Sequence, residues 1–277
     1  MSRELTLRIY SAIVMVAVVL AATWFGGLAF RILAGAIGLF VYYEWSSMTR
    51  LGERSMRGHA FGWFSMAAIV ANMLFGQGDL TVPLFAGLVL TAALPAIIGN
   101  WSWWQPGGIF YAGLSAVSLA AIRGEDQLGF AAMIFVFAVV WSTDILAYFV
   151  GRAIGGPKLA PRISPGKTWS GAIGGTIAGV LGGVAVALSF FQSIGLWVPL
   201  IALFLSVAGQ IGDLFESFIK RRFGVKDSSH LIPGHGGVMD RVDALVFACF
   251  AAFFIAVGFS AVGMGAVDSL GAFLFGL

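Results

Sequence analysis

The chain has 277 residues, of which 59% are hydrophobic and only 10% are charged, and its mean hydropathy is +0.94. A soluble domain is typically about 45–50% apolar and about 25% charged, so this composition excludes a soluble enzyme, a disordered chain and a secreted disulfide scaffold. The net charge of +3 comes from bases in short loops between apolar runs. That placement is typical of membrane orientation rather than of nucleic-acid binding.

In chain order, nine apolar stretches are candidates to cross a bilayer, since one spanning helix uses about 20 residues. They are 9–27, 29–47, 60–76, 80–98, 108–122, 129–150, 171–191, 197–219 and 243–264. The stretch 108–122 is short and contains glycine, so we use the distribution of lysines and arginines to decide whether it spans the membrane. With it counted, all sixteen lysines and arginines except Arg31 and Arg123 fall on one side, which is then cytoplasmic. We therefore expect an all-α polytopic integral membrane protein with about nine transmembrane helices and a cytoplasmic N-terminus.

We expect one membrane domain overall, with its chemistry concentrated in the second half. Residues 1–128 form N-terminal membrane helices for packing and a lipid groove. Residues 129–264 form the catalytic membrane helices, with cytoplasmic loops at 151–169 and 220–242.

A glycine recurs at every fourth position of one predicted helix, at Gly171, Gly175, Gly179 and Gly183. Such a stripe gives a smooth face that lets helix backbones approach closely in lipid. We expect it to serve packing, and a groove that accommodates lipid is the alternative.

Five acidic side chains lie inside or at the start of the later spans: Asp144, Asp213, Glu216, Asp240 and Asp243. A carboxylate in the hydrocarbon region costs on the order of a few kcal/mol, so each needs cations, metal or water nearby. Asp213 and Glu216 are three residues apart, as are Asp240 and Asp243, so each pair shares one helix face. Mg²⁺ prefers carboxylate oxygens together with substrate phosphates. Pairing with neighbouring lysines and arginines is the alternative.

Bases flank these acids in both loops: Arg152, Lys158, Arg162, Lys167, Lys220, Arg221, Arg222, Lys226 and Arg241. Acids for a metal ion beside bases for phosphate indicate a phosphoryl- or nucleotidyl-transfer site. The alternative is that the bases only anchor helix ends and contact anionic lipid. We prefer that alternative for Arg152, Lys158 and Arg222.

The run from Ser164 to Thr168 contains Gly-Lys-Thr, as a P-loop does. A P-loop needs a glycine five residues before Gly166, where this chain has Pro161, and we expect no strand before it. Lys167 is still able to meet a phosphate as a point charge, with Ser164 and Thr168 as hydroxyl donors.

The second loop contains the run Pro233-Gly234-His235-Gly236-Gly237 and leads into a helix that starts near Asp240. Exposed N–H groups at a helix start attract anions, so we expect backbone to approach a ligand here. His235 is a phosphate donor, a general base or a turn residue. Because an ionised phosphate nucleophile needs no strong base, we do not assign base catalysis to it.

Three runs carry a family resemblance. They are Ser217-Phe218-Ile219-Lys220-Arg221, then Lys226-Asp227, then His235-Gly236-Gly237-Val238-Met239-Asp240-Arg241-Val242-Asp243. Together they resemble the signature of the phosphatidate cytidylyltransferase (CDP-diacylglycerol synthase) family. The segments 164–169 and 144–152 also resemble that family, so the resemblance covers about 140–245. The family usually has Glu after Lys-Thr-Trp, where this chain has Ser170.

The resemblance implies that CTP and phosphatidic acid react to give CDP-diacylglycerol and pyrophosphate, with Mg²⁺ as cofactor and a second ion left open. Together with the residue pattern it predicts metal ligands at Asp144, Asp213, Asp240 and Asp243. Predicted catalytic residues are Lys220, Arg221, Lys226, Asp227 and Arg241. Predicted substrate-binding residues are Ser164, Lys167, Thr168, Ser217, His235, Gly236 and Gly237.

The expected partners are CTP, phosphatidic acid and membrane lipids. We expect no nucleic acid, and a homodimer is left open. The expected location is the bacterial cytoplasmic (inner) membrane, with the site facing the cytosol. A CTP-dependent polyprenol kinase or a related CDP-lipid synthase is the alternative. A transporter is less favoured because its polar residues should lie near the bilayer midplane. The Asp-Gly-x-x-Ala-Arg run of a CDP-alcohol phosphotransferase is absent.

Overall fold

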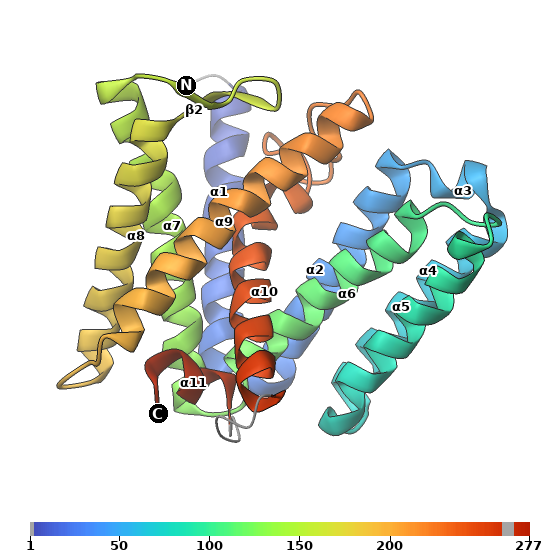
Figure 1. The fold of residues 1–277 in the computed structure, drawn as a ribbon, viewed down its shortest axis with the longest axis horizontal. Helices are drawn as coiled ribbons and strands as arrows, with labels where there is room; N and C mark the ends of the chain where they lie inside the picture. Colours follow the sequence, from blue (N-terminus) through green and yellow to red (C-terminus); the bar gives the residue numbers. More distant parts are fainter. Residues whose placement is uncertain (1–2, 262–268) are drawn as a thin grey trace. The chain divides into compact units, whose positions relative to one another are not determined.

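The structure is a computed structural model that describes residues 3–261 and 269–277. Within these ranges nine helices are long and apolar enough to cross a membrane, and they coincide with the nine predicted stretches, including 108–122 (Figure 1). Residues 262–264 of the last predicted span lie outside the described residues. The prediction of a polytopic all-α protein is confirmed.

The chain divides into two compact units, each described by itself. Unit 1 comprises the described residues of Met1–Ala120 together with Arg222–Arg241. Unit 2 comprises Ala121–Arg221 and the described residues of Val242–Leu277. The loop at 223–238, which carries the middle part of the signature described above, therefore groups with the N-terminal helices, although the helices on both sides of it in the sequence belong mainly to unit 2.

Unit 1 is a group of helices joined by short turns. Its elements are α1 (Arg3–Phe25), α2 (Gly27–Met48), α3 (Leu51–Arg54), α4 (Met56–Phe75), the 3₁₀ turn η1 (Gly78–Leu80), α5 (Thr81–Ile97) and most of α6 (Trp104–Arg123). Helix α2 packs against α1 and α4, and α4 packs against α5. The Ser55 hydroxyl starts α4 by accepting the Gly58 N–H at 3.1 Å, which satisfies one of the donors that a helix start leaves unpaired.

Buried polar contacts fix the rotation of α2 against α6. The Tyr42 hydroxyl accepts a hydrogen bond from Gln105 Nε2 at 3.0 Å, and Trp45 Nε1 donates to the Trp104 carbonyl at 2.9 Å. The Trp45 ring also stacks on Tyr111. Because Glu44 lies between Tyr42 and Trp45 in the same helix, these contacts also fix the direction of its side chain.

Unit 2 contains the remaining long helices and a small hairpin. Its elements are α7 (Gln127–Ile154), β1 (Lys158–Ala160), β2 (Ser164–Thr168), α8 (Trp169–Phe190), α9 (Trp197–Arg222), α10 (Met239–Ala261) and α11 (Leu270–Phe275), with Arg222 and the first three residues of α10 in unit 1. Asp126 caps α7 by accepting the Gly129 N–H, and α7 ends at Gly155, whose φ is +67°. Positive φ is accessible to glycine at little cost, so the helix stops there.

The glycine stripe of α8 lies directly against α7. A Cβ atom added at Gly175 would come 2.6 Å from the Thr143 carbonyl oxygen, and one added at Gly171 would come 2.6 Å from that of Ala147. Both distances are too short for any side chain. The interpretation of the stripe as a packing surface is therefore confirmed.

Polar and close backbone contacts tie the other helices of unit 2 together. Thr143 on α7 and Ser206 on α9 lie 2.8 Å apart, Oγ1 to Oγ. Gln210 Nε2 on α9 donates to Thr176 Oγ1 on α8 at 2.8 Å. Gly212 of α9 packs so closely on α10 that an added Cβ would come 2.6 Å from the Asp243 carbonyl oxygen. Helices α7 to α10 thus form one packed group.

Candidate active site

Three carboxylates from three helices of unit 2 lie within electrostatic reach of one another. They are Asp144 on α7, Asp213 on α9 and Asp243 on α10, and both Asp213 and Asp243 repel Asp144. Asp213 also repels Asp243. We call this set the acidic cluster. Like charges brought together inside membrane-spanning helices are costly unless protons or nearby cations neutralise them.

Two lysines supply part of that positive charge. Lys167 Nζ forms an ion pair with Asp213 Oδ2, and Lys220 Nζ donates to Glu216 Oε2 at 3.0 Å. Glu216 is 1% exposed, so its charge depends on this partner. Lys220 also attracts Asp243 electrostatically. The alternative interpretation, that acids pair with neighbouring bases, therefore holds for Asp213 and Glu216.

The donor atoms of the acidic cluster are of the type that binds magnesium. Its ligand atoms are carboxylate oxygens, which hard divalent cations prefer, and Mg²⁺ commonly takes one or two carboxylates plus substrate oxygens. Across the described ranges, no three His, Cys, Asp or Glu side chains stand together in metal-binding geometry. In this structure Asp213 is paired with Lys167, so binding of a metal ion by Asp213 would require Lys167 to turn toward another anion.

The hairpin β1–β2 carries the predicted substrate residues of the first loop. Its strands are antiparallel, with Ala160 opposite Ser164 and Lys158 opposite Thr168. The expectation that no strand precedes Gly166 is wrong, because β1 does. The rejection of a P-loop stands, because Gly166 and Lys167 lie within a strand rather than in a loop that encloses phosphate.

At the end of β2, Ser170, which stands where the resembled family usually has Glu, contacts its neighbours through its hydroxyl. Thr168 caps α8, its hydroxyl accepting the Gly171 N–H at 3.2 Å. The Ser170 hydroxyl lies 3.1 Å from that of Thr168 and donates to the Gly155 carbonyl oxygen. Ser170 therefore ties the end of α7 to the start of α8. Thr168 is buried and occupied with the cap, which leaves Lys167 as the side chain of this strand that reaches the acidic cluster.

In unit 1, a buried acid that our sequence reasoning missed holds the 223–238 loop. Glu44 on α2 is 0% exposed. Its Oε1 accepts hydrogen bonds from the Ser229 hydroxyl at 2.6 Å and the Val238 N–H at 2.8 Å. Its Oε2 accepts from the Ser228 hydroxyl at 3.1 Å and the Met239 N–H at 2.6 Å. An acid inside an apolar stretch was the signal that could have found it.

Asp240 folds back onto the same loop. Its Oδ2 accepts the N–H of Ser228 at 2.9 Å and the N–H of Gly237 at 2.8 Å. The Ser228 hydroxyl lies 2.8 Å from the same oxygen. The N–H groups of Gly237, Val238 and Met239 at the start of α10 are thus taken by the protein's own carboxylates. The expectation that backbone here approaches an anionic ligand stays a prediction, and these three N–H groups are already paired within the chain.

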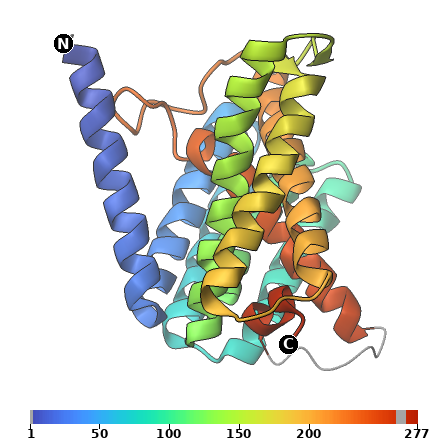
Figure 2. The ribbon, with the colours of Figure 1, turned by 90° about the vertical axis from the view of Figure 1, so that its left-hand side faces the viewer.

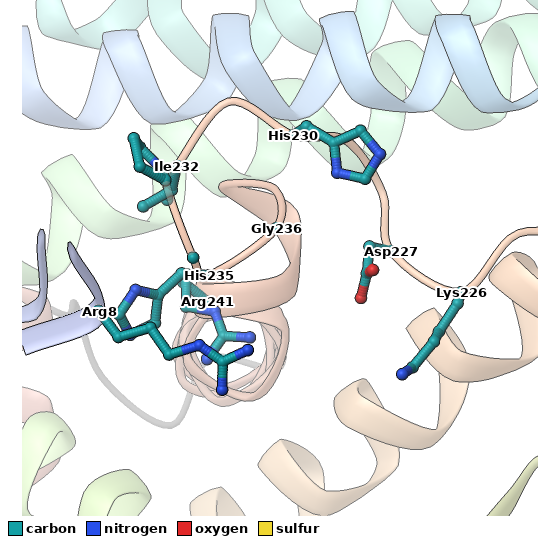
Figure 3. A pocket seen from close by; sticks show the side chains of 10 residues that line it. Arg8, Lys226, Asp227, His230, Ile232, His235, Gly236 and Arg241 are labelled. Carbon is teal, nitrogen blue, oxygen red and sulfur yellow. The ribbon is translucent and has the colours of Figure 1, made fainter. Parts of the chain in front are cut away.

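A cavity of about 460 Å³ opens beside this loop in unit 1. We call it the basic pocket, and its lining residues are Arg8, Lys226, Asp227, His230, Ile232, Pro233, Gly234, His235, Gly236 and Arg241. Figure 3 shows Arg8, His235 and Arg241 gathered on one side and Lys226 with Asp227 on the other. The predicted residues Lys226, Asp227, His235, Gly236 and Arg241 are therefore brought together. Arg8 was not predicted.

The predicted site residues fall into the two units. Unit 2 holds Asp144, Ser164, Lys167, Thr168, Asp213, Ser217, Lys220, Arg221 and Asp243. Unit 1 holds Lys226, Asp227, His235, Gly236, Gly237, Asp240 and Arg241. Ser217 lies 3.5 Å from Asp213, Oγ to Oδ1, and Arg221 is exposed at the end of α9. Each unit thus contributes a charged cluster of its own, acidic in one and basic in the other.

A carboxylate cluster together with a cationic pocket in a polytopic membrane protein is a combination that suits an enzyme acting on phosphate groups. The chain belongs to the Cytidylyltransferase family, whose model matches residues 6–259. It is therefore a membrane-bound nucleotidyltransferase.

Bacterial relatives support this assignment. A protein of Brucella abortus biovar 1 named phosphatidate cytidylyltransferase is 48% identical over 249 residues, which cover 88% of this chain and 90% of that protein. A Bacillus subtilis protein of the same name is 35% identical, with 91% of this chain and 98% of that protein covered. One from Pseudomonas aeruginosa is 34% identical, with 92% and 98% covered.

Proposed function

We propose that this chain transfers the cytidylyl group of CTP to phosphatidic acid, giving CDP-diacylglycerol and pyrophosphate for phospholipid synthesis. The observation that carries the proposal is the near full-length similarity to relatives that bear this enzyme's name. The acidic cluster with Lys167 and the basic pocket supply the charges that the reaction requires. Family membership favours this enzyme over a transporter.

In the proposed reaction an oxygen of the lipid phosphate attacks the α-phosphorus of CTP. A new P–O bond forms there while the bond to the bridging oxygen of the β-phosphate breaks, and pyrophosphate leaves with that electron pair. Asp144, Asp213 and Asp243 would hold Mg²⁺, which when bound offsets negative charge on the phosphates. Asp240, three residues before Asp243, is the candidate fourth ligand, because hydrogen bonds from the protein commonly orient a ligating carboxylate.

The basic residues bind and orient the phosphates. Lys167 and Lys220 lie beside the acidic cluster, and Lys226 and Arg241 line the basic pocket. We assign Arg221 to the same group because it follows Lys220 at the end of α9. In nucleotidyl transfer, positioning and electrostatic stabilisation supply most of the rate. The lipid phosphate is already ionised, so His235 is a binding rather than a base residue.

We place the enzyme in a bacterial cytoplasmic membrane with the N-terminus and the site facing the cytosol. This orientation follows from the bases, of which all but Arg31 and Arg123 fall on one side of the nine spans. It lets acyl chains stay in the bilayer while CTP arrives from water.

The test uses purified protein, Mg²⁺ and CTP labelled at the α- or the γ-phosphate, with phosphatidic acid, diacylglycerol or polyprenol as acceptor. We expect the α-label to enter lipid only with phosphatidic acid, with release of pyrophosphate. Entry of the γ-label into a lipid alcohol would instead make this chain a kinase. Movement of neither label with folded protein would contradict both.

A further inference from the structure

Helix α1 contacts the 223–238 loop through a short polar patch near its beginning. The Ser11 hydroxyl lies 2.8 Å from Nδ1 of His235 and 3.1 Å from the Pro233 carbonyl oxygen. Figure 2 shows α1, in dark blue, with its first turns beside this orange loop. Most side chains of α1 are exposed or half-buried, so this contact is specific in a helix that otherwise buries little.

The next contact along α1 directs Arg8 into the basic pocket. Gly234 has a φ of +76°, and a Cβ atom added to it would come 2.7 Å from Cγ of Arg8. The aliphatic part of Arg8 therefore packs on the loop backbone. Its guanidinium group reaches the pocket on the side of His235 and Arg241 (Figure 3).

The charge of the basic pocket is suited to an anion. Arg8, Lys226 and Arg241 carry fixed positive charges, and Asp227 is the acid among the lining residues. Cations that share one cavity repel each other, and an anion between them removes that repulsion. The planar fork of arginine matches phosphate oxygens with two parallel hydrogen bonds. The cavity of about 460 Å³ accommodates a phosphate group with several waters, each of which takes about 30 Å³.

We propose that Arg8 is a substrate-binding residue and that α1 completes a subsite for a phosphate-bearing anion in the basic pocket. This inference rests on the proposed function and deepens it. The anion is the phosphate chain of the nucleotide or the phosphate monoester of the lipid, which present the same oxygens and negative charge. Ser11 holds α1 on the loop, and Arg8 binds the anion.

The kinetic test compares Arg8→Ala with Arg57→Ala, a control on α4 whose side chain is exposed and lies outside the pocket. We expect Arg8→Ala to raise KM for one of the two substrates about tenfold, as loss of a charged hydrogen bond does, with a smaller change in kcat. Arg8→Lys should recover part of the loss, because it keeps the charge without the fork.

The two substrates distinguish the source of the anion. A higher KM for CTP alone assigns the subsite to the nucleotide, and a higher KM for phosphatidic acid alone assigns it to the lipid. Both results support the proposal. If both KM values of Arg8→Ala equal those of Arg57→Ala, the proposal is wrong, whatever happens to kcat.

A binding measurement separates this proposal from the proposed function. Inorganic pyrophosphate and a water-soluble short-chain phosphatidate are titrated into purified wild-type and variant proteins. Binding of either probe that weakens at least fivefold in Arg8→Ala, and not in Arg57→Ala, supports the subsite even without cytidylyl transfer. Equal binding in all three proteins, or no binding to the wild type, overturns it. If Arg8→Ala does not fold, Arg8→Gln keeps the contact with Gly234 and gives the same comparison.

Discussion

Both units place carboxylates in membrane-spanning helices, and what surrounds those carboxylates differs. In unit 1, Glu44 and Asp240 accept hydrogen bonds from N–H and hydroxyl groups of the 223–238 loop and the start of α10. In unit 2, Asp144, Asp213 and Asp243 repel one another and attract lysines. Fixed dipoles satisfy the first group and hold backbone in place, whereas the second remains an attractive site for a cation. The donors around an acid in a span therefore determine how much of its charge is left for a cation, and Asp240, which holds the loop and is also a proposed ligand, is the acid that tests this comparison.

The largest effect should come from the acidic cluster. We expect Asp243→Asn to lower turnover about a thousandfold, which corresponds to about 4 kcal/mol of lost transition-state stabilisation, because a metal-binding carboxylate is lost. The free energy of unfolding should stay nearly unchanged, since the substitution also removes a charge that Asp144 and Asp213 repel. Transfer of the α-label measures turnover, and thermal unfolding in detergent measures stability.

Asp240→Asn is the matched variant on the same helix face. It should lower turnover to a similar extent, but it should unfold more easily than Asp243→Asn, because the Oδ2 of Asp240 holds the loop. Near-normal activity in both variants would contradict the metal assignment. Activity lost in Asp243→Asn alone would remove Asp240 from the ligand set.

The next effect concerns stability in unit 1. Glu44→Gln replaces one acceptor oxygen by an NH₂ group, so donors among Ser228, Ser229, Val238 and Met239 lose a buried partner. We expect the free energy of unfolding to fall by about 2 kcal/mol. Glu53→Gln, at an exposed position of α3, is the control. Equal unfolding temperatures for the two variants would show that Glu44 does not hold the loop.

The membrane spans could be predicted from the sequence, whereas contacts between residues far apart in the sequence could not. Hydropathy and the placement of bases identified the nine long apolar helices found in residues 3–261 and 269–277, including α6, because lipid allows few other backbone arrangements. The acids of α7, α9 and α10 were found because charge in an apolar run is costly. Their separation from the basic pocket into another unit was not predictable, since the 223–238 loop follows α9 directly in the sequence.

Glu44 and Arg8 show why some residues of the site were not predicted from the sequence. Glu44 and Val238 are 194 positions apart, and Ser11 and His235 are 224 apart. No sequence pattern near Arg8 or Glu44 indicates that the helix face carrying it contacts the 223–238 loop. The hairpin β1–β2 was missed for another reason, because both strands are short and β2 contains proline and glycine, which are rare in strands.

The smallest expected effect distinguishes Ser228, whose hydroxyl lies beside two carboxylates, from Ser229, whose hydroxyl contacts one of them. Ser228 Oγ lies 3.1 Å from Glu44 Oε2 and 2.8 Å from Asp240 Oδ2, whereas the Ser229 hydroxyl contacts Glu44. Each change to alanine should lower the free energy of unfolding by about 1 kcal/mol, because each removes the hydrogen bond that the hydroxyl donates to a carboxylate. Only Ser228→Ala should also raise the Mg²⁺ concentration needed for half-maximal turnover, by a few-fold, since it loosens Asp240. The measurement is a Mg²⁺ titration of α-label transfer for both variants. Equal shifts, or none, would mean that the donors around Asp240 hold the loop without orienting a metal ligand, and Asp240 would then belong with Glu44 rather than with the acidic cluster.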